Sequence, residues 1–96
     1  MDTNRIIKAM KALSNKNRFE IFMEIYNSNK QTSYEKEECF VYDIMEKINI
    51  GAPTISHHLK ELSNADLIIT EKKGKNIVAR INKETVKEIS NILKLE

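Results

Sequence analysis

Apolar residues recur every three or four positions in four stretches before residue 65, a period typical of amphipathic helices. The predicted helices span about residues 3–13, 16–27, 40–48 and 52–64. Between the second and the third, the polar segment SNKQTSYEKEE at residues 28–38 has no apolar period and indicates a solvated loop. Pro53 suits the first turn of the fourth helix, and only a short break around Gly51 separates that helix from the third. The third and fourth helices are therefore a predicted helix-turn-helix.

After Asp66 the apolar period changes from helical spacing to strict alternation. Residues 67–72 and 77–81 are the predicted strands of an antiparallel hairpin, with its turn at Lys73–Asn76. A last amphipathic helix is predicted over about residues 83–95. A helix-turn-helix followed directly by a hairpin has the order of elements of a winged helix-turn-helix.

We therefore expect a fold that is mainly α with a β-hairpin (α+β), in the order α-α-α-α-β-β-α, as a single winged helix-turn-helix domain over residues 1–96. Hydrophobic residues make up 41% of the chain and charged residues 31%, which favours a helix-rich globular protein over a disordered one. No apolar run approaches the roughly 18 residues of a membrane span, and the start of the chain lacks the apolar region of a signal peptide. We expect a cytoplasmic protein with no membrane partner, and the single cysteine, Cys39, agrees with a reducing compartment.

Charge is distributed unevenly along the chain. The net charge is +2; residues 1–50 carry eight basic and eight acidic side chains, whereas residues 51–96 carry eight basic and six acidic ones. The excess lies in the half that contains the hairpin, whose turn gathers Lys72, Lys73 and Lys75. These cations can bind phosphates of double-stranded DNA beside the groove that a helix-turn-helix occupies. An ordinary solvated turn is the alternative.

The fourth predicted helix offers further candidates for contact with DNA. Its inward face is set by Ile55, Leu59 and Leu62. Short polar and basic side chains remain outside, where they can reach base edges or phosphates in a major groove. They are Thr54, Ser56, His57 and Lys60. Two of them have structural alternatives, because Ser56 can bond within the helix and Thr54 can cap its N-terminus.

Four short segments, taken together, match the pattern of a known family. ALSNKNRFEI at residues 12–21 resembles the family's ALSDPTRLRIL, with Asn and Lys where Asp and Pro are usual. PTISHHLKEL at residues 53–62 resembles PTVSRHLKLL, and ADLI at residues 65–68 resembles AGLV. KGK at residues 73–75 lies where the family has an R-x-G-R turn. The chain thus resembles the ArsR/SmtB-type transcriptional repressors of bacteria and archaea over nearly its whole length.

The resemblance implies a homodimer whose first and last helices form the interface and whose two recognition helices enter successive major grooves of an operator. It also implies that His58 packs between helices or contacts a phosphate, whereas His57 faces the groove. The apolar stripes of the two terminal helices suit such an interface, and completion of a monomeric core is the alternative. A small-molecule or protein effector is compatible with this interpretation, although the sequence does not name one.

Many members of this family sense metals, but the expected ligands are missing here. In ECFVYDI at residues 38–44, Phe40 and Tyr42 stand where the family has thiolates, and Cys39 is one position out of register. Residues 82–96 contain no histidine for the second usual site, on the last helix. We therefore predict that neither usual metal site is present.

The neighbouring histidines His57 and His58 are the remaining candidates for metal ligands. Adjacent residues on a helix point about 100° apart, and neither cysteine nor a third histidine is nearby in the sequence. We therefore expect no metal and no cofactor.

The pattern as a whole predicts a sequence-specific DNA-binding repressor, with two alternatives left open. The near-neutral charge is compatible with a winged-helix protein-interaction module that does not read DNA, and Cys39 with a thiol-based redox sensor. No enzyme is expected, because the chain has no phosphate-binding glycine loop and no nucleophile–base constellation.

Overall fold

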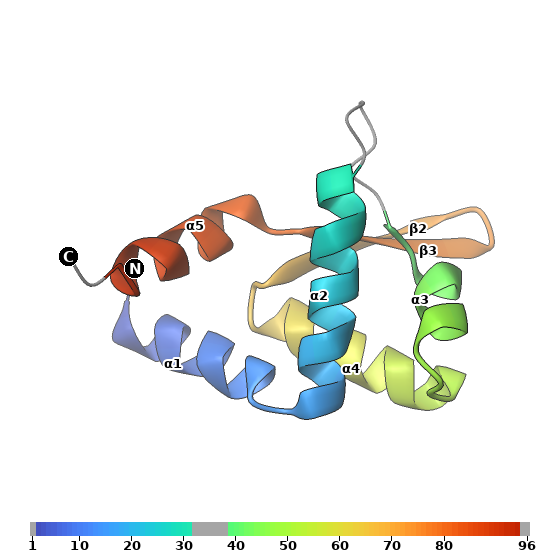
Figure 1. Ribbon diagram of the computed structural model, residues 1–96, viewed down its shortest axis with the longest axis horizontal. Helices are drawn as coiled ribbons and strands as arrows, with labels where there is room; N and C mark the ends of the chain where they lie inside the picture. Colours follow the sequence, from blue (N-terminus) through green and yellow to red (C-terminus); the bar gives the residue numbers. More distant parts are fainter. Residues whose placement is uncertain (1, 32–38, 95–96) are drawn as a thin grey trace.

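The computed structural model describes residues 2–31 and 39–94, with the side chains of residues 29–31 and 39–40 left outside this description. The first half of the chain contains α1 (Thr3–Leu13), α2 (Lys16–Gln31), β1 (Cys39–Phe40) and α3 (Val41–Lys47). The second half contains α4 (Ala52–Asn64), β2 (Ile68–Lys73), β3 (Asn76–Ile81) and α5 (Lys83–Ile92). Figure 1 shows α2 crossing in front of α4, with the β2–β3 hairpin at one end of the long axis and α1 and α5 at the other. The five helices and the hairpin confirm the predicted fold class.

Local capping explains where several helices begin. The side chain of Asp2 accepts a hydrogen bond from the amide of Asn4 at 2.7 Å, and that of Asn15 accepts one from the amide of Arg18 at 3.0 Å. Asn82 caps α5 in the same way, accepting from the amide of Thr85 at 3.4 Å. These polar side chains satisfy amides that would otherwise lack partners inside the helix.

The structure differs from the sequence-based expectation in three places. Helix α2 continues to Gln31, so the first part of the segment predicted as a loop is helical, while residues 32–38 lie outside the described chain. The short strand β1 was not predicted; it pairs with β3 through Cys39 opposite Ala79 and Phe40 opposite Val78, which gives a three-stranded sheet in the order β1-β3-β2. The last helix ends at Ile92, earlier than the predicted residue 95.

One apolar core joins the helix-turn-helix to the rest of the fold. Ile21 and Ile25 of α2 are fully buried, as are Ile55 and Leu62 of α4, and Leu59 is nearly so. The predicted inward face of α4 is therefore confirmed. Because burial of a large aliphatic side chain contributes about 1.5–3 kcal/mol, these contacts fix the orientation of α4 and of its polar outer face.

Helix α4 ends at a residue whose backbone adopts the left-handed conformation, with a positive φ. Asp66 has φ 60° and follows the C-cap Ala65. Its amide donates to the carbonyl of Ser63 at 3.0 Å, and the amide of Leu67 donates to that of Leu62 at 3.1 Å. This pair of bonds is a Schellman motif, a helix ending that favours glycine at the position held by Asp66. The chain thereby turns sharply from α4 into β2.

Replacing Asp66 with Gly is expected to raise the free energy of unfolding by about 0.5–1 kcal/mol, because glycine adopts positive φ without a steric penalty. The change also removes the Arg5–Asp66 ion pair at 3.5 Å, but both side chains are about half exposed, so this loss is small. Urea denaturation followed by circular dichroism measures the difference. Asp66→Ala is the control: it loses the same ion pair and keeps the unfavourable φ, so it should destabilise the protein. A destabilised Asp66→Gly would mean that the ion pair outweighs the backbone strain.

The hairpin has a two-residue turn at its tip. Lys73 pairs with Asn76, which leaves Gly74 and Lys75 as the central residues, and Gly74 has φ 62°. A positive φ at the first central position fits a type II′ turn, whose twist matches that of antiparallel strands. The turn holds the lysines at the outer end of the hairpin.

Among the described residues, no helix is long and apolar enough to cross a membrane.

Candidate nucleic-acid interface

The outer face of α4 presents the predicted contact residues to solvent. Thr54, Ser56, His57 and Lys60 are all exposed. Gly51 is the N-cap of α4, so Thr54 lies inside the first turn and does not cap the helix. Within the described part of the chain, neither Thr54 nor Ser56 makes a side-chain hydrogen bond. The structural alternatives for these two hydroxyls therefore receive no support, and both remain available to a ligand.

The two histidines of α4 lie in different environments. His58 is only 7% exposed, whereas His57 is exposed, and their ring centroids are 5.8 Å apart. Burial lowers the pKa of His58, and the nearby charges of Arg18 and His57 lower it further. His58 therefore packs on the inner side of α4. This burial favours its packing role over the phosphate contact, which stays a prediction.

Arg18 of α2 lies near His58 of α4. Its Nη1 donates to the carbonyl of Ala12 at 3.3 Å, which ties the start of α2 to the end of α1. The Nε of Arg18 and the Nδ1 of His58 are buried and have no hydrogen-bond partner among the described residues. The sequence pattern gave no indication that these two side chains approach each other, because they lie on different helices.

The hairpin lysines lie at and near the outer end of the β2–β3 hairpin, which is the wing of the fold. Lys72, Lys73 and Lys75 are exposed, in agreement with the predicted turn at Lys73–Asn76. Further back along the hairpin, Arg80 of β3 pairs with Glu71 of β2 at 3.7 Å, which offsets the negative charge of Glu71. The end of the hairpin is consequently positive, and it lies at the opposite end of the molecule from α1 and α5 (Figure 1).

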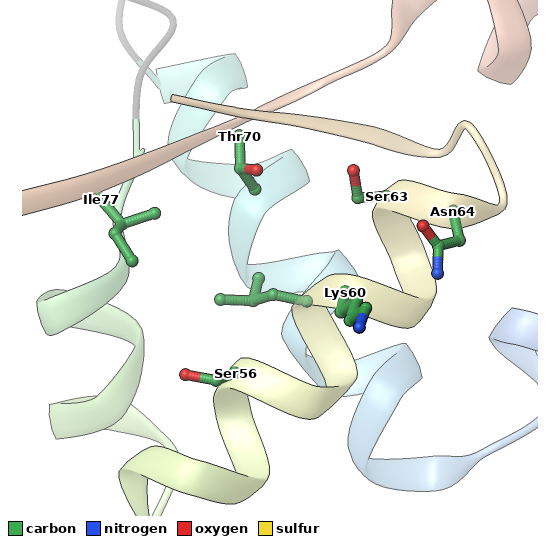
Figure 2. A pocket seen from close by; sticks show the side chains of 7 residues that line it. Ser56, Lys60, Ser63, Asn64, Thr70 and Ile77 are labelled. Carbon is green, nitrogen blue, oxygen red and sulfur yellow. The ribbon is translucent and has the colours of Figure 1, made fainter. Parts of the chain in front are cut away.

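A groove runs between α4 and the hairpin and encloses about 240 Å³. Its lining residues are Ser56, Leu59, Lys60, Ser63, Asn64, Thr70 and Ile77. Figure 2 shows Thr70 and Ile77 extending from the strands toward α4, with Ser56, Lys60, Ser63 and Asn64 along the helix. Sequence reasoning missed Ser63, Asn64 and Thr70 as candidates. The alternation of the strand could have found Thr70, because it shares a face with the buried Ile68.

Two further predictions concern metal binding and redox chemistry. Among the described residues, no group of three or more His, Cys, Asp or Glu side chains is placed to hold a metal ion. Cys39 lies in β1, but its side chain falls outside the described part of the structure. A role for its thiol in redox sensing therefore stays a prediction.

The helix-turn-helix matches a known family model. Residues 34–70, which include α3, the turn and all of α4, match the model described as "Bacterial regulatory protein, arsR family". This part of the chain is therefore similar to the helix-turn-helix of that family. The matched residues include two of the four segments that carry the family resemblance, 53–62 and 65–68.

A curated relative matches about half of the chain. The Transcriptional repressor SdpR of Bacillus subtilis (strain 168) is 39% identical over 49 residues, which are 51% of this chain and 54% of the relative. The chain thus aligns with about half of the length of that relative.

Solved structures extend the likeness to the whole fold. A crystal structure of an ArsR family transcriptional regulator superimposes with a TM-score of 0.76 at 16% identity, covering 97% of this chain and 87% of that one. An ArsR-like transcriptional regulator from Rhodococcus sp. RHA1 gives a TM-score of 0.73 at 19% identity, covering 95% and 77%. At such identities the comparison establishes the fold alone, a winged helix in which α3 and α4 form the helix-turn-helix and β2–β3 the wing.

Proposed function

We propose that this protein is a sequence-specific DNA-binding transcriptional regulator that represses its target genes as a homodimer. The observation that carries the proposal is the exposed polar face of α4, within the ArsR-family segment and beside a wing that ends in lysines. The curated relative is described as a transcriptional repressor, which supports the direction of regulation. No metal or cofactor takes part in this proposal.

In the proposed complex, the N-terminal half of α4 enters a major groove. Thr54, Ser56 and His57 face the base edges, and Lys60 reaches a phosphate. Lys72, Lys73 and Lys75 meet the neighbouring backbone or minor groove. His58 supports the helix from within the protein, because its ring is buried against the core.

The proposed dimer is formed by α1 and α5. Helix α5 buries only Thr85 completely, and Ile92 and Leu93 at its end are exposed. On α1, Ile7 and Met10 are exposed in the same way. Exposed apolar side chains on two helices at one end of the molecule are typical of an interface between subunits.

Selection of bound fragments from the source genome, followed by fluorescence anisotropy on the selected duplex, tests the proposal. We expect salt-sensitive binding in the nanomolar range, because specific complexes of this kind have dissociation constants of about 10⁻⁸–10⁻¹¹ M. His57→Ala and Lys60→Ala should each weaken binding about tenfold, since each removes a contact worth about 1–3 kcal/mol.

Asn27→Ala is the control, because Asn27 is exposed on α2, outside α4, the wing and the proposed interface. It should leave the affinity for the selected duplex unchanged. Equal affinity of the wild type and both α4 variants would rule out α4 as the recognition helix. A wild type that shows no preference among DNA sequences but captures a protein partner would instead support an interaction module.

A further inference from the structure

The groove between α4 and the wing contains hydrogen-bonding groups that the fold does not use. The side chains of Ser56, Ser63, Asn64 and Thr70 all line it. None of them makes a hydrogen bond with another described residue, although several surface side chains elsewhere on the protein do. Four such groups in one groove form a polar surface that is prepared for an external ligand.

The charge of the groove favours an anion. Lys60 is the only ionisable residue among the seven lining residues, and it makes no ion pair with any described residue. No carboxylate lines the groove, and Glu71, the one acidic residue of β2, is paired with Arg80. Hydroxyl and amide donors together with one ammonium group suit phosphate oxygens, which accept charge-assisted hydrogen bonds.

The shape of the groove favours a chain of alternating polar and apolar groups. Ile77, which is 44% exposed, extends from β3 toward α4 (Figure 2), and Leu59 of α4 is the second apolar residue that lines the groove. Thr70 lies on the same face of the hairpin as Ile77. Apolar side chains next to unpaired donors match the sugar and phosphate units of a nucleic-acid strand.

The position of the groove is compatible with a nucleic-acid strand in the proposed complex. Because α4 forms one wall and the hairpin the other, a duplex that accepts α4 in its major groove and the wing beside it must bring one backbone across this gap. We propose that the groove binds the sugar–phosphate backbone of one DNA strand. Ser63, Asn64 and Thr70 donate to phosphate oxygens, Lys60 neutralises a phosphate at the mouth, and Ile77 contacts a sugar. This inference rests on the proposed DNA-binding function.

The proposal predicts a particular dependence on salt. Asn64→Ala and Thr70→Val should each lower affinity about tenfold, for the selected operator and for an unrelated duplex alike, because hydrogen bonds to charged groups contribute at this level. The slope of log K against log salt concentration should stay unchanged, since neutral donors release no counterions. Lys60→Gln should instead reduce that slope by about 0.9. Anisotropy titrations at four or more salt concentrations measure both quantities.

Asn27→Ala is the matched control, because Asn27 is exposed on α2, which lies behind α4 in the view of Figure 2. Its affinity and slope should equal those of the wild type, and circular dichroism should show all variants folded. Unchanged affinity of both Asn64→Ala and Thr70→Val would overturn the proposal. A loss confined to the operator, with an altered base preference, would also overturn it, because the groove would then read bases.

A neutral methylphosphonate placed at single positions of the operator gives a direct test. At one position the methylphosphonate should weaken wild-type binding about tenfold. At the same position it should not affect the Asn64→Ala/Thr70→Val double variant, because that variant already lacks the side chains that donate to this phosphate. Additive losses at every position would contradict the assignment. Failure of the proposed function is distinguishable, because the wild type itself would then bind no unmodified duplex.

Discussion

An acidic side chain in place of Ile92 is expected to abolish dimerisation and to lower the affinity for a two-half-site operator by about 100-fold. Ile92 is 45% exposed at the end of α5, so the change itself disturbs little of the subunit's own core. In the proposed interface, Ile92→Glu buries a carboxylate without a partner, which opposes association. A monomer loses the gain of about 10²–10⁴ in affinity that two linked binding modules provide. Sedimentation velocity measures the mass, and anisotropy measures the affinity.

Phe19→Glu is the matched control for this experiment. Phe19 lies on α2, outside the proposed interface, and its exposed fraction of 46% is close to that of Ile92. This variant should remain dimeric and bind the operator as the wild type does. A dimeric Ile92→Glu, or a wild type that sediments as a monomer while binding tightly, would show that α1 and α5 do not form the interface.

Replacing Ile55 with Ala is expected to lower the free energy of unfolding by about 2–5 kcal/mol, since truncation of a buried isoleucine loses transfer energy and leaves a cavity. Ile55 is 0% exposed and anchors the N-terminal half of α4. The total stability of a small domain is about 5–15 kcal/mol, so the change removes a large share of it. Thermal unfolding followed by circular dichroism should show a lower midpoint, and operator binding should persist below that midpoint.

The same substitution at an exposed isoleucine provides the comparison. Ile69 of β2 is 38% exposed, so Ile69→Ala should lower the free energy of unfolding by less than about 1 kcal/mol. Equal losses at the two positions would show that Ile55 is not an anchor of α4. Loss of DNA binding by folded Ile55→Ala at low temperature would indicate that this side chain also shapes the outer face of the helix.

The inward aliphatic side chains of α4 and four of its outward polar ones could be read from the sequence, because helical geometry sets which residues share a face. Once Ile55, Leu59 and Leu62 are assigned to the core, the 3.6-residue turn directs Thr54, Ser56, His57 and Lys60 outward. The same reasoning located the hairpin lysines, because Gly74 marks the turn between two alternating segments. Both patterns are local, so no knowledge of distant contacts was needed.

Other features depend on residues that are distant in the sequence. Strand β1 has only two residues, too few to display a period, and it exists because β3 offers a free edge to Cys39 and Phe40. The approach of Arg18 to His58 joins α2 to α4, and its effect on the pKa of His58 follows only from that packing. No periodicity within either helix contains this information.

The sequence by itself determined the order of the five helices and the hairpin, the aliphatic face of α4 and the ArsR-family resemblance, because caps, turns and apolar periods act over a few residues. Only the tertiary structure decided that His58 is buried while its neighbour is exposed, and that Ser63, Asn64 and Thr70 share a groove. The Schellman ending at Asp66 turns the chain so that β2 runs back beside α4. Side chains from two elements then face one another, a relation that arises from packing rather than from spacing along the chain.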